Sequence, residues 1–401
     1  MNLLEILFLN LTLSLATRVP SAAQDTLQPM LPGPQPAART ERAAGHSVTN
    51  APQPEPAVPA LLKLFSKYQV VGLADLHGCA ELLAFVEQLV QQPEFSATVN
   101  DFTWEPGNAR FQSVMDDFIL QGREVPYLEL AECWRNNTQV HTYSDTPALF
   151  HLLQTIQKSN RRLPAERRVR VLLIDPPVDW SRIKSTADLR AKDFDRESHM
   201  AEVLEREVYA KGRKALFFAG GAHLGRGGSP LQNLERKHPG TTVNIGIHDG
   251  FGDRTDELEA RLVSWPKPAL SFIRNTWWGD LPPPPSGDIF VGPGGAPIQP
   301  APDRKIQDNW DAVLFLGKRR ELTRVNPPGP EVLDDRWIAE LKRRKAIVGG
   351  PGGIPDPSQK PQSRQFFPAD PPPGDRIQRL PFNGLPPGST KVLPPPKPDP
   401  K

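Results

Sequence analysis

The sequence predicts an α/β fold, with a mostly parallel sheet flanked by helices on both faces, in one domain over residues 61–325. Short apolar runs of strand length alternate along this region with longer segments whose apolar residues recur at helical spacing. The run VRVLLI at 169–174 is apolar apart from Arg170, as in strands that are covered on both faces. Strand and helix alternation of this kind favours right-handed crossovers between parallel strands. We therefore expect a three-layer domain.

The expected elements follow one another in chain order. The β-branched run at 69–74 predicts a buried strand, and the apolar stripe within 80–92 predicts a helix after it. Gly212 suits the position that ends a helix over 195–210. The other expected elements are strands over 99–104, 169–174, 215–219, 242–247 and 312–316, and helices over 109–120 and 147–159.

Proline marks the segments that flank this domain. The chain holds 47 Pro in 401 residues, about twice ordinary usage, and they concentrate near its two ends. Polyproline stretches act as spacers or dock a protein partner, and both alternatives apply to the C-terminal tail. We expect a Pro- and Ala-rich linker over 24–60, a Pro-rich surface loop over 281–302, a terminal helical segment over 326–350 and a disordered tail over 351–401.

The first residues predict export. An apolar run from Leu3 to Ala16 precedes small residues at 21–23, which is typical of a secretory signal over 1–23 that is cleaved near Ala23. An uncleaved membrane anchor is the alternative, although the run is short for a span of about 20 residues. No later stretch of the sequence is long and apolar enough to cross a bilayer. We therefore expect a secreted or periplasmic protein without stable membrane insertion after cleavage.

Charge and cysteine content narrow the classes of partner and site. The net charge is +2 with both signs interspersed, which gives no support for a nucleic-acid partner. Cys79 and Cys133 are the two cysteines, enough for one disulfide in an exported protein but not for a disulfide scaffold. The sequence has no CxxC, HExxH or Cys/His cluster with the spacing of a structural zinc site.

Acidic and histidine residues follow five of the predicted strands. In open parallel sheets ligands bind in the crevice at the carboxyl ends of the strands, so this coincidence predicts a pocket. A single Asp or His at such a place is as readily a helix cap or a satisfied polar group. In strand order the residues are Asp75 and His77, then Glu105 and Asn108, then Asp175, Asp179 and Trp180, then Gly220 and His223, and finally His248 and Asp249.

Arg196 continues the apolar stripe of its predicted helix. A guanidinium on a buried face needs a carboxylate or an anionic substrate beside it, because an unpaired buried charge is very costly. Its partner is therefore Glu105 or Asp175, or the substrate itself. His199 lies three residues further on and could share the same face. Three tryptophans lie near these residues, either as walls of a pocket or as part of the core: Trp104, Trp134 and Trp180.

Four motifs resemble one superfamily. VVGLADLHG, DFTWEPGNARFQ, DRESHMA and FFAGGAHLG look like the erythromycin-esterase-like, ChaN-like and Tiki superfamily, and the resemblance covers about residues 65–325. RVLLIDPPVDW and AVLFLG also resemble a bacterial subgroup of unassigned activity. In this chain Ala74 and Asp75 stand where the superfamily usually has Gly and Glu. The resemblance implies a site made of Asp75, His77, Glu105, Arg196 and His223, with Gly220 completing the second Gly-x-x-His.

These residues predict a hydrolase-like protein. Neutral His77, held by Asp75 or Glu105, could take a proton from a water that attacks an ester, lactone or amide carbonyl. His223 or Arg196 would stabilise the developing oxyanion. No G-x-S-x-G elbow offers a competing nucleophile. A small-molecule or peptide substrate would then be bound by Asn108, Asp175, Asp179, Trp180, His199 and His248.

Two further hypotheses use the same residues. In the first, His77, Glu105 and His223 hold a divalent transition metal (Zn, Mn or Co) that activates the water, as the Tiki branch implies. In the second, the protein is not an enzyme and binds haem or another small ligand, as the ChaN branch implies. The chain contains only 4 Tyr to serve as haem ligands, so the sequence supports this alternative weakly.

Overall fold

The structure is a computed structural model of the whole chain. The structure describes residues 50–140, 142–189, 195–226, 229–283, 303–329 and 332–348. The expected signal at 1–23, most of the linker at 24–60, most of the loop at 281–302 and the tail at 351–401 lie outside these residues.

The strands form one sheet in the order β1-β7-β8-β6-β2-β5-β3-β4. Neighbouring strands from β8 to β4 pair in parallel, while β7 pairs antiparallel with β8 and β1 antiparallel with β7. The bounds are β1 Glu55–Pro56, β2 Val70–Asp75, β3 Asp101–Asn108, β4 Arg170–Asp175, β5 Ala215–Gly220, β6 Thr242–Ile247, β7 Ala269–Phe272 and β8 Ala312–Phe315.

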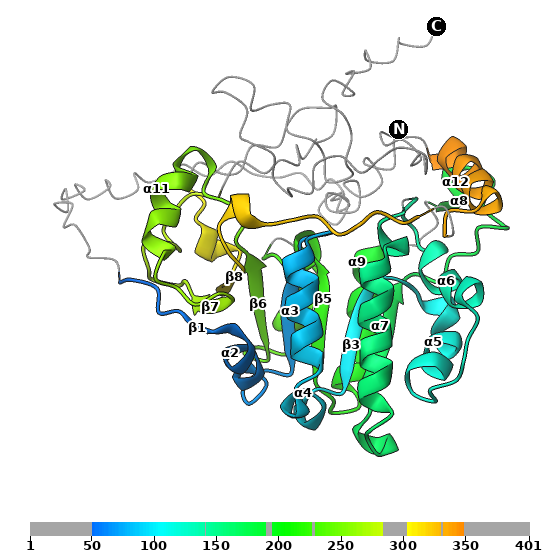
Figure 1. Cartoon of the computed structure of the whole chain (residues 1–401), viewed down its shortest axis with the longest axis horizontal. Helices are drawn as coiled ribbons and strands as arrows, with labels where there is room; N and C mark the ends of the chain where they lie inside the picture. The colour runs from blue at the N-terminus through cyan, green and yellow to red at the C-terminus, as the bar shows by residue number, and fades with distance from the viewer. Residues whose placement is uncertain are drawn as a thin grey trace, which may run out of the picture.

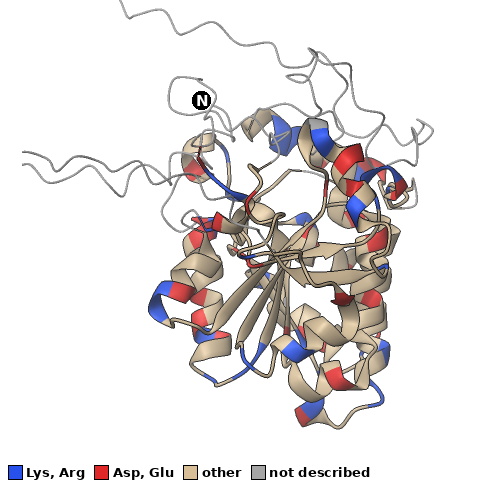
Figure 2. Ribbon diagram, turned by 90° about the vertical axis from the view of Figure 1, so that its left-hand side faces the viewer, with Lys and Arg blue, Asp and Glu red and all other residues tan. Residues whose placement is uncertain are grey.

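Helices cover both faces of this sheet, which confirms the predicted fold class. Figure 1 shows α3 and α7 in front of the strands, and Figure 2 shows the charged residues mostly on the helices and loops around an almost uncharged sheet. The helices are α2 Ala57–Leu64, α3 Ala80–Val90, α4 Pro93–Thr98, α5 Gln112–Ile119, α6 Tyr127–Arg135, α7 Pro147–Asn160, α8 Thr186–Leu189, α9 Arg196–Leu204, α10 Pro230–Lys237, α11 Thr255–Glu259 and α12 Asp335–Val348.

Alternation along the strands divides the core into two layers. In β2, Val71 and Leu73 pack on the face covered by α3 and α7, while Val70 and Ala74 pack on the opposite face against α9 and α10. All six residues of β2 are buried, as expected of a central parallel strand. A third cluster, rich in aromatic residues, lies around α11 and the β7–β8 end of the sheet.

The structure differs from the expected elements in two respects. The last part of the expected linker is folded, because β1 and α2 occupy 55–64. Pro59 does not prevent α2, since it lies in the first helical turn, where the backbone N–H has no partner within the helix. In addition, β7 was not predicted from the sequence.

Cys79 and Cys133 are both free and buried, so the permitted disulfide is not formed. No helix among the described residues is long and apolar enough to span a membrane.

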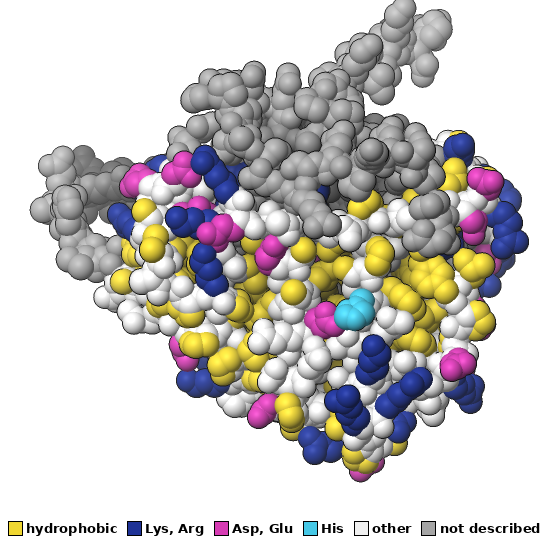
Figure 3. Space-filling model, viewed as in Figure 1, with side chains coloured by type: hydrophobic (Ala, Val, Ile, Leu, Met, Phe, Trp, Pro, Cys, Tyr) yellow, Lys and Arg dark blue, Asp and Glu magenta, His cyan; other side chains and the backbone are white. Residues whose placement is uncertain are grey.

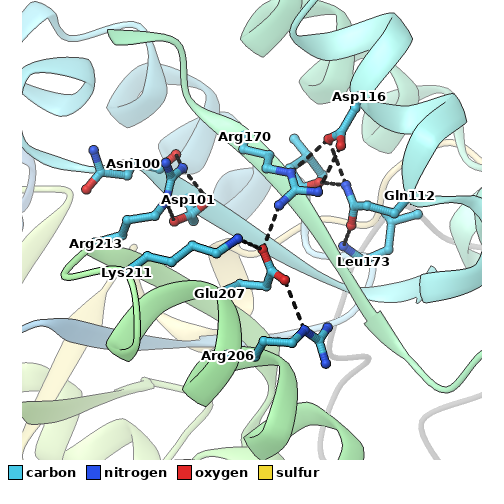
Figure 4. Close-up of polar contacts among 11 residues, drawn as sticks. Asn100, Asp101, Gln112, Asp116, Arg170, Leu173, Arg206, Glu207, Lys211 and Arg213 are labelled. Carbon is cyan, nitrogen blue, oxygen red and sulfur yellow. Dashed lines mark hydrogen bonds and ion pairs between the residues drawn. The ribbon is translucent and has the colours of Figure 1, made fainter. Parts of the chain in front are cut away.

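The amino ends of the strands carry a network of ion pairs. Arg170, at the start of β4, binds both oxygens of Asp116 (2.9 and 2.8 Å) and also contacts Glu207 at 2.9 Å (Figure 4). Gln112 donates to the carbonyl of Val171 and accepts from the N–H of Leu173 on β4 (both 2.9 Å). Gln112 thus hydrogen-bonds backbone groups of β4, an edge strand of the sheet. Unpaired backbone groups on such a strand can pair with a strand of another chain.

The outer surface mixes both signs of charge. On the face covered by α3 and α7, acidic and basic side chains are interspersed with apolar atoms, and Lys and Arg side chains gather toward the lower end (Figure 3). Residues near the end of α7 include Lys158, Arg161 and Arg162.

Candidate functional site

Four neighbouring strands bring the candidate residues to one edge of the sheet. Asp75 ends β2, Gly220 ends β5, Glu105 lies in β3 and Asp175 ends β4. The pairing of β3 with β4 shifts register between Trp104 and Asn108, next to Glu105. Such an irregularity re-aims a side chain near the end of a strand. The sequence placed these four residues at the carboxyl ends of parallel strands, and the structure brings them together there.

Asp75 and His77 form a hydrogen-bonded pair. His77 Nδ1 lies 2.8 Å from Asp75 Oδ2, and the hydroxyl of Tyr143 donates to the same oxygen at 2.8 Å. Asp75 is buried, whereas the His77 side chain remains 24% exposed. Burial alone would lower the pKa of His77, but the charges of Asp75 and Glu105 outweigh it and raise the pKa above 6.5. The other ring nitrogen, Nε2, lies 3.8 Å from Glu105 Oε2.

Glu105 is the hub of the cluster. Its Oε1 lies 3.1 Å from Arg196 Nη2 and 3.2 Å from His223 Nε2. Its Oε2 accepts from the backbone N–H of Gly220 at 2.6 Å and lies 3.8 Å from His77 Nε2. Burial would raise the pKa of Glu105, but the neighbouring His223, His77 and Arg196 hold it well below its ordinary range. Glu105 is therefore an ionised anchor for two cations.

Arg196 is held by two carboxylates. Its Nε donates to Asp175 Oδ1 at 2.6 Å, in addition to the contact with Glu105. Asp175 is fully buried and also accepts from the N–H and hydroxyl of Thr138, at 2.6 and 2.8 Å. The carboxylate partners expected from the buried position of Arg196 are thus both present. Arg196 Nη1 and Asp75 Oδ1 are buried and have no hydrogen-bond partner among the described residues.

His223 is a buried cation. Its Nε2 faces Glu105 and its Nδ1 lies 2.7 Å from Glu197 Oε1. Burial would lower the pKa of His223, but Glu197 and Glu105 raise it to about 10. His223 therefore carries its charge at neutral pH and cannot serve there as a base.

Three predicted substrate-binding residues have structural contacts outside this cluster. Asn108 donates to the carbonyls of Asn136 and Val178, at 2.7 and 2.8 Å. Asp179 pairs with Arg110 at 2.5 Å, and its hydrogen bonds from Ser181 and Arg110 lower its pKa to about 2. Trp180 is buried and donates to a backbone carbonyl. Asp179 and Trp180 line a separate hollow of about 540 Å³ beside α12.

Two predicted histidines also lie apart from it. His248 is buried among aromatic rings and contacts Glu259 at 2.8 Å, so it belongs to the third core cluster. The groups that act on His199 are Glu202 and Arg206 rather than the candidate residues, and burial lowers its pKa. Trp104 and Trp134 pack against each other in the core, with ring centroids 5.4 Å apart, rather than lining a pocket.

The residues of the cluster do not fit a metal centre as they are arranged. Both oxygens of Glu105 already serve cations or a backbone donor, and both ring nitrogens of His223 face carboxylates. No group of three or more His, Cys, Asp or Glu residues in the described part of the chain is arranged to hold a metal ion. Haem ligation fits no better at Tyr143, since its hydroxyl donates to Asp75.

Tyr143 is one residue of the cluster that the sequence did not reveal. It lies in the short 3-10 turn η3 (Tyr143–Asp145), which follows no strand and carries no recognisable motif. Its ring lies 4.8 Å from that of His77. A lone tyrosine in a connecting segment gives no signal that sequence reasoning could have used.

Comparisons with known proteins identify no family for this chain. No family model matches it, and no curated protein is significantly similar. A Bacillus cereus protein of known structure is 11% identical, with a TM-score of 0.44 over 66% of this chain and 94% of that one. A succinoglycan biosynthesis protein is 14% identical (TM-score 0.44, 67% and 95%), and the type III effector HopBA1 is 14% identical (TM-score 0.33, 51% and 89%). All three likenesses are distant.

Proposed function

We propose that this chain is an exported hydrolase-like protein of the erythromycin-esterase-like, ChaN-like and Tiki type, in which His77 activates water for attack on a carbonyl. The observation that carries the proposal is the Asp75–His77 pair. Its imidazole is held at Nδ1 and partly exposed at the carboxyl edge of the sheet, beside buried cations. An oriented imidazole beside a carboxylate is the arrangement of a general base.

In the proposed reaction His77 Nε2 takes a proton from the attacking water. Asp75 fixes the tautomer that carries its hydrogen on Nδ1, and it stabilises the imidazolium that forms. The water oxygen bonds to the carbonyl carbon of an ester, lactone or amide, and the carbonyl becomes an oxyanion. The imidazolium then returns the proton to the leaving oxygen or nitrogen as the tetrahedral intermediate collapses.

The cations beside His77 would stabilise the oxyanion. Arg196 and His223 each contact Glu105 Oε1, and Arg196 Nη1 keeps an unused N–H group. Because these charges are already fixed by carboxylates, they need no reorganisation when negative charge develops. This metal-free reaction suits the cluster better than a metal-assisted one, since Glu105 and His223 have no free ligand atom.

A substrate panel tests the proposal. We expect the purified protein to hydrolyse at least one member of a panel of aryl esters, lactones and peptides, and Glu105→Gln to abolish that turnover by weakening its hold on Arg196 and His223. Equal turnover by the wild type and Glu105→Gln would overturn the proposal. The visible spectrum and metal content decide the alternatives: a Soret band favours the haem binder, and one transition metal per chain favours the metallohydrolase.

A further inference from the structure

The turn η3 connects the Asp75–His77 pair with the helix α12. We propose that Tyr143 is a positioning residue for this pair, and that α12 keeps it in place through Asp145. This inference rests on the proposed function of His77, because it assigns a residue to that same site. It also makes a segment near the end of the described chain part of the active-site architecture.

The first step is the contact between Tyr143 and the pair. The Tyr143 hydroxyl and His77 Nδ1 meet the same oxygen of Asp75, each at 2.8 Å. The two rings also pack, with centroids 4.8 Å apart and planes inclined at 44°. Burial and the charge of Asp75 raise the pKa of Tyr143 well above 10, so the hydroxyl keeps its proton and donates. Tyr143 thus fixes the carboxylate that orients the imidazole.

The second step is the rigidity of the turn. The N–H of Asp145 donates to the carbonyl of Thr142 at 3.0 Å, and the N–H of Thr146 donates to that of Tyr143 at 3.3 Å. Tyr143 and Asp145 therefore belong to one hydrogen-bonded turn, and whatever holds Asp145 also sets the backbone of Tyr143. Asp145 is itself buried.

The third step is the clasp on Asp145, formed by Trp134, Arg135 and Trp337. The Trp134 indole and Arg135 Nε donate to its Oδ1 at 3.0 and 2.9 Å. Trp337, from α12, donates to its Oδ2 at 2.9 Å across 192 positions of sequence. All three donors are buried, so the carboxylate is fully engaged away from water.

Two arginine side chains also hold α12 against the residues that bind Asp145. The Arg135 guanidinium lies 4.9 Å from the centre of the Trp337 ring, and that of Arg344 lies 5.0 Å from it. Arg344 Nη2 also donates to Asn136 Oδ1 at 2.9 Å. In Figure 1, α12 lies at the upper edge of the molecule near α6, the helix that supplies Trp134 and Arg135. The helix is therefore joined to the turn by buried, directional contacts.

The test observes the His77 Nδ1 proton by NMR, which requires no turnover. We expect a downfield imidazole N–H resonance in the wild type that is absent from His77→Gln. Tyr143→Phe keeps the ring and removes the hydroxyl, so the resonance should shift or vanish by exchange, and kcat/KM on any hydrolysed ester should fall about tenfold. Tyr209→Phe is the matched control, because the Tyr209 hydroxyl bonds Thr241 at 2.8 Å and its ring stacks on His238 at 4.0 Å, outside the site.

A second variant tests the role of α12. Trp337→Phe removes the N–H that binds Asp145 and should move the same resonance, whereas Trp265→Phe in the third core cluster should leave it unchanged. If the resonance does not move in folded Tyr143→Phe, the inference is overturned. If it moves in Tyr143→Phe but not in Trp337→Phe, the part assigned to α12 is overturned. If the resonance moves while the wild type hydrolyses nothing, the proposed function fails and the positioning contact stands.

Discussion

Gly220 leaves room for the site, and a single methyl group there should disturb it. An added Cβ would lie 3.2 Å from His77 Nε2 and 3.3 Å from Glu105 Oε2. Contacts between carbon and other heavy atoms are most favourable at about 3.5–4.0 Å, so both side chains must yield by a few tenths of an ångström. The neighbouring Gly221 provides a matched control, because a Cβ there meets only the Trp310 ring, at 3.4 Å.

The expected cost falls on activity rather than on stability. Overpacking a rigid core costs about 1–3 kcal/mol, and Gly220→Ala should lie at the lower limit because the partly exposed His77 ring can move aside. A catalytic group displaced by a fraction of an ångström loses about 10- to 100-fold in rate. Urea unfolding and kcat/KM on the best ester of the panel measure the two effects. Full activity of Gly220→Ala, or an equal loss in Gly221→Ala, would refute the reasoning.

Three other predictions concern stability and reactivity. Arg196→Met leaves the buried Asp175 without its cation and removes one of the cations of Glu105, so it should lower the free energy of unfolding by about 3–5 kcal/mol. Arg206→Met, at a side chain that is 61% exposed, should change it by less than about 0.5 kcal/mol. The pKa of His223 is raised from 6.5 in the unfolded chain to about 10 in the fold. The stability that protonated His223 gives the folded protein is therefore complete below pH 6.5 and is lost as the pH rises through 10. The difference in the free energy of unfolding between the wild type and His223→Gln should shrink over that range. Burial raises the pKa of Cys79 and Cys133 to about 12, so neither native thiol should react with a disulfide reagent at pH 8 and both should react after unfolding.

The fold could largely be predicted because its central strands are strongly apolar. The strand over 242–247 has the predicted bounds, and four others differ from theirs by one residue at one or both ends. The strand expected over 99–104 extends further, since β3 occupies 101–108. β7 was missed because its four residues, ALSF, lie between prolines and a loop and show too short an apolar run. The first half of α2, residues 57–60, was assigned to the linker because proline composition outweighed its buried residues, Ala57 and Ala60.

The candidate site could be predicted where strand topology decides position. The carboxyl ends of adjacent parallel strands must meet, and this brought together Asp75, Glu105 and Asp175. The same rule failed for His248, which follows β6 but turns toward the aromatic cluster, and for Asp179, which lies beyond two prolines on a loop. Side-chain direction in loops depends on tertiary packing, which no local pattern encodes.

The role of His77 is the central claim, and one comparison of kcat/KM tests it most directly. His77→Gln removes the base, and His151→Gln is the control, since His151 is 55% exposed and also pairs with a glutamate, Glu87, at 2.9 Å. With the best ester of the panel at pH 8, we predict that His77→Gln loses at least about 100-fold in kcat/KM and His151→Gln keeps the wild-type value. Wild-type turnover by His77→Gln would contradict the account.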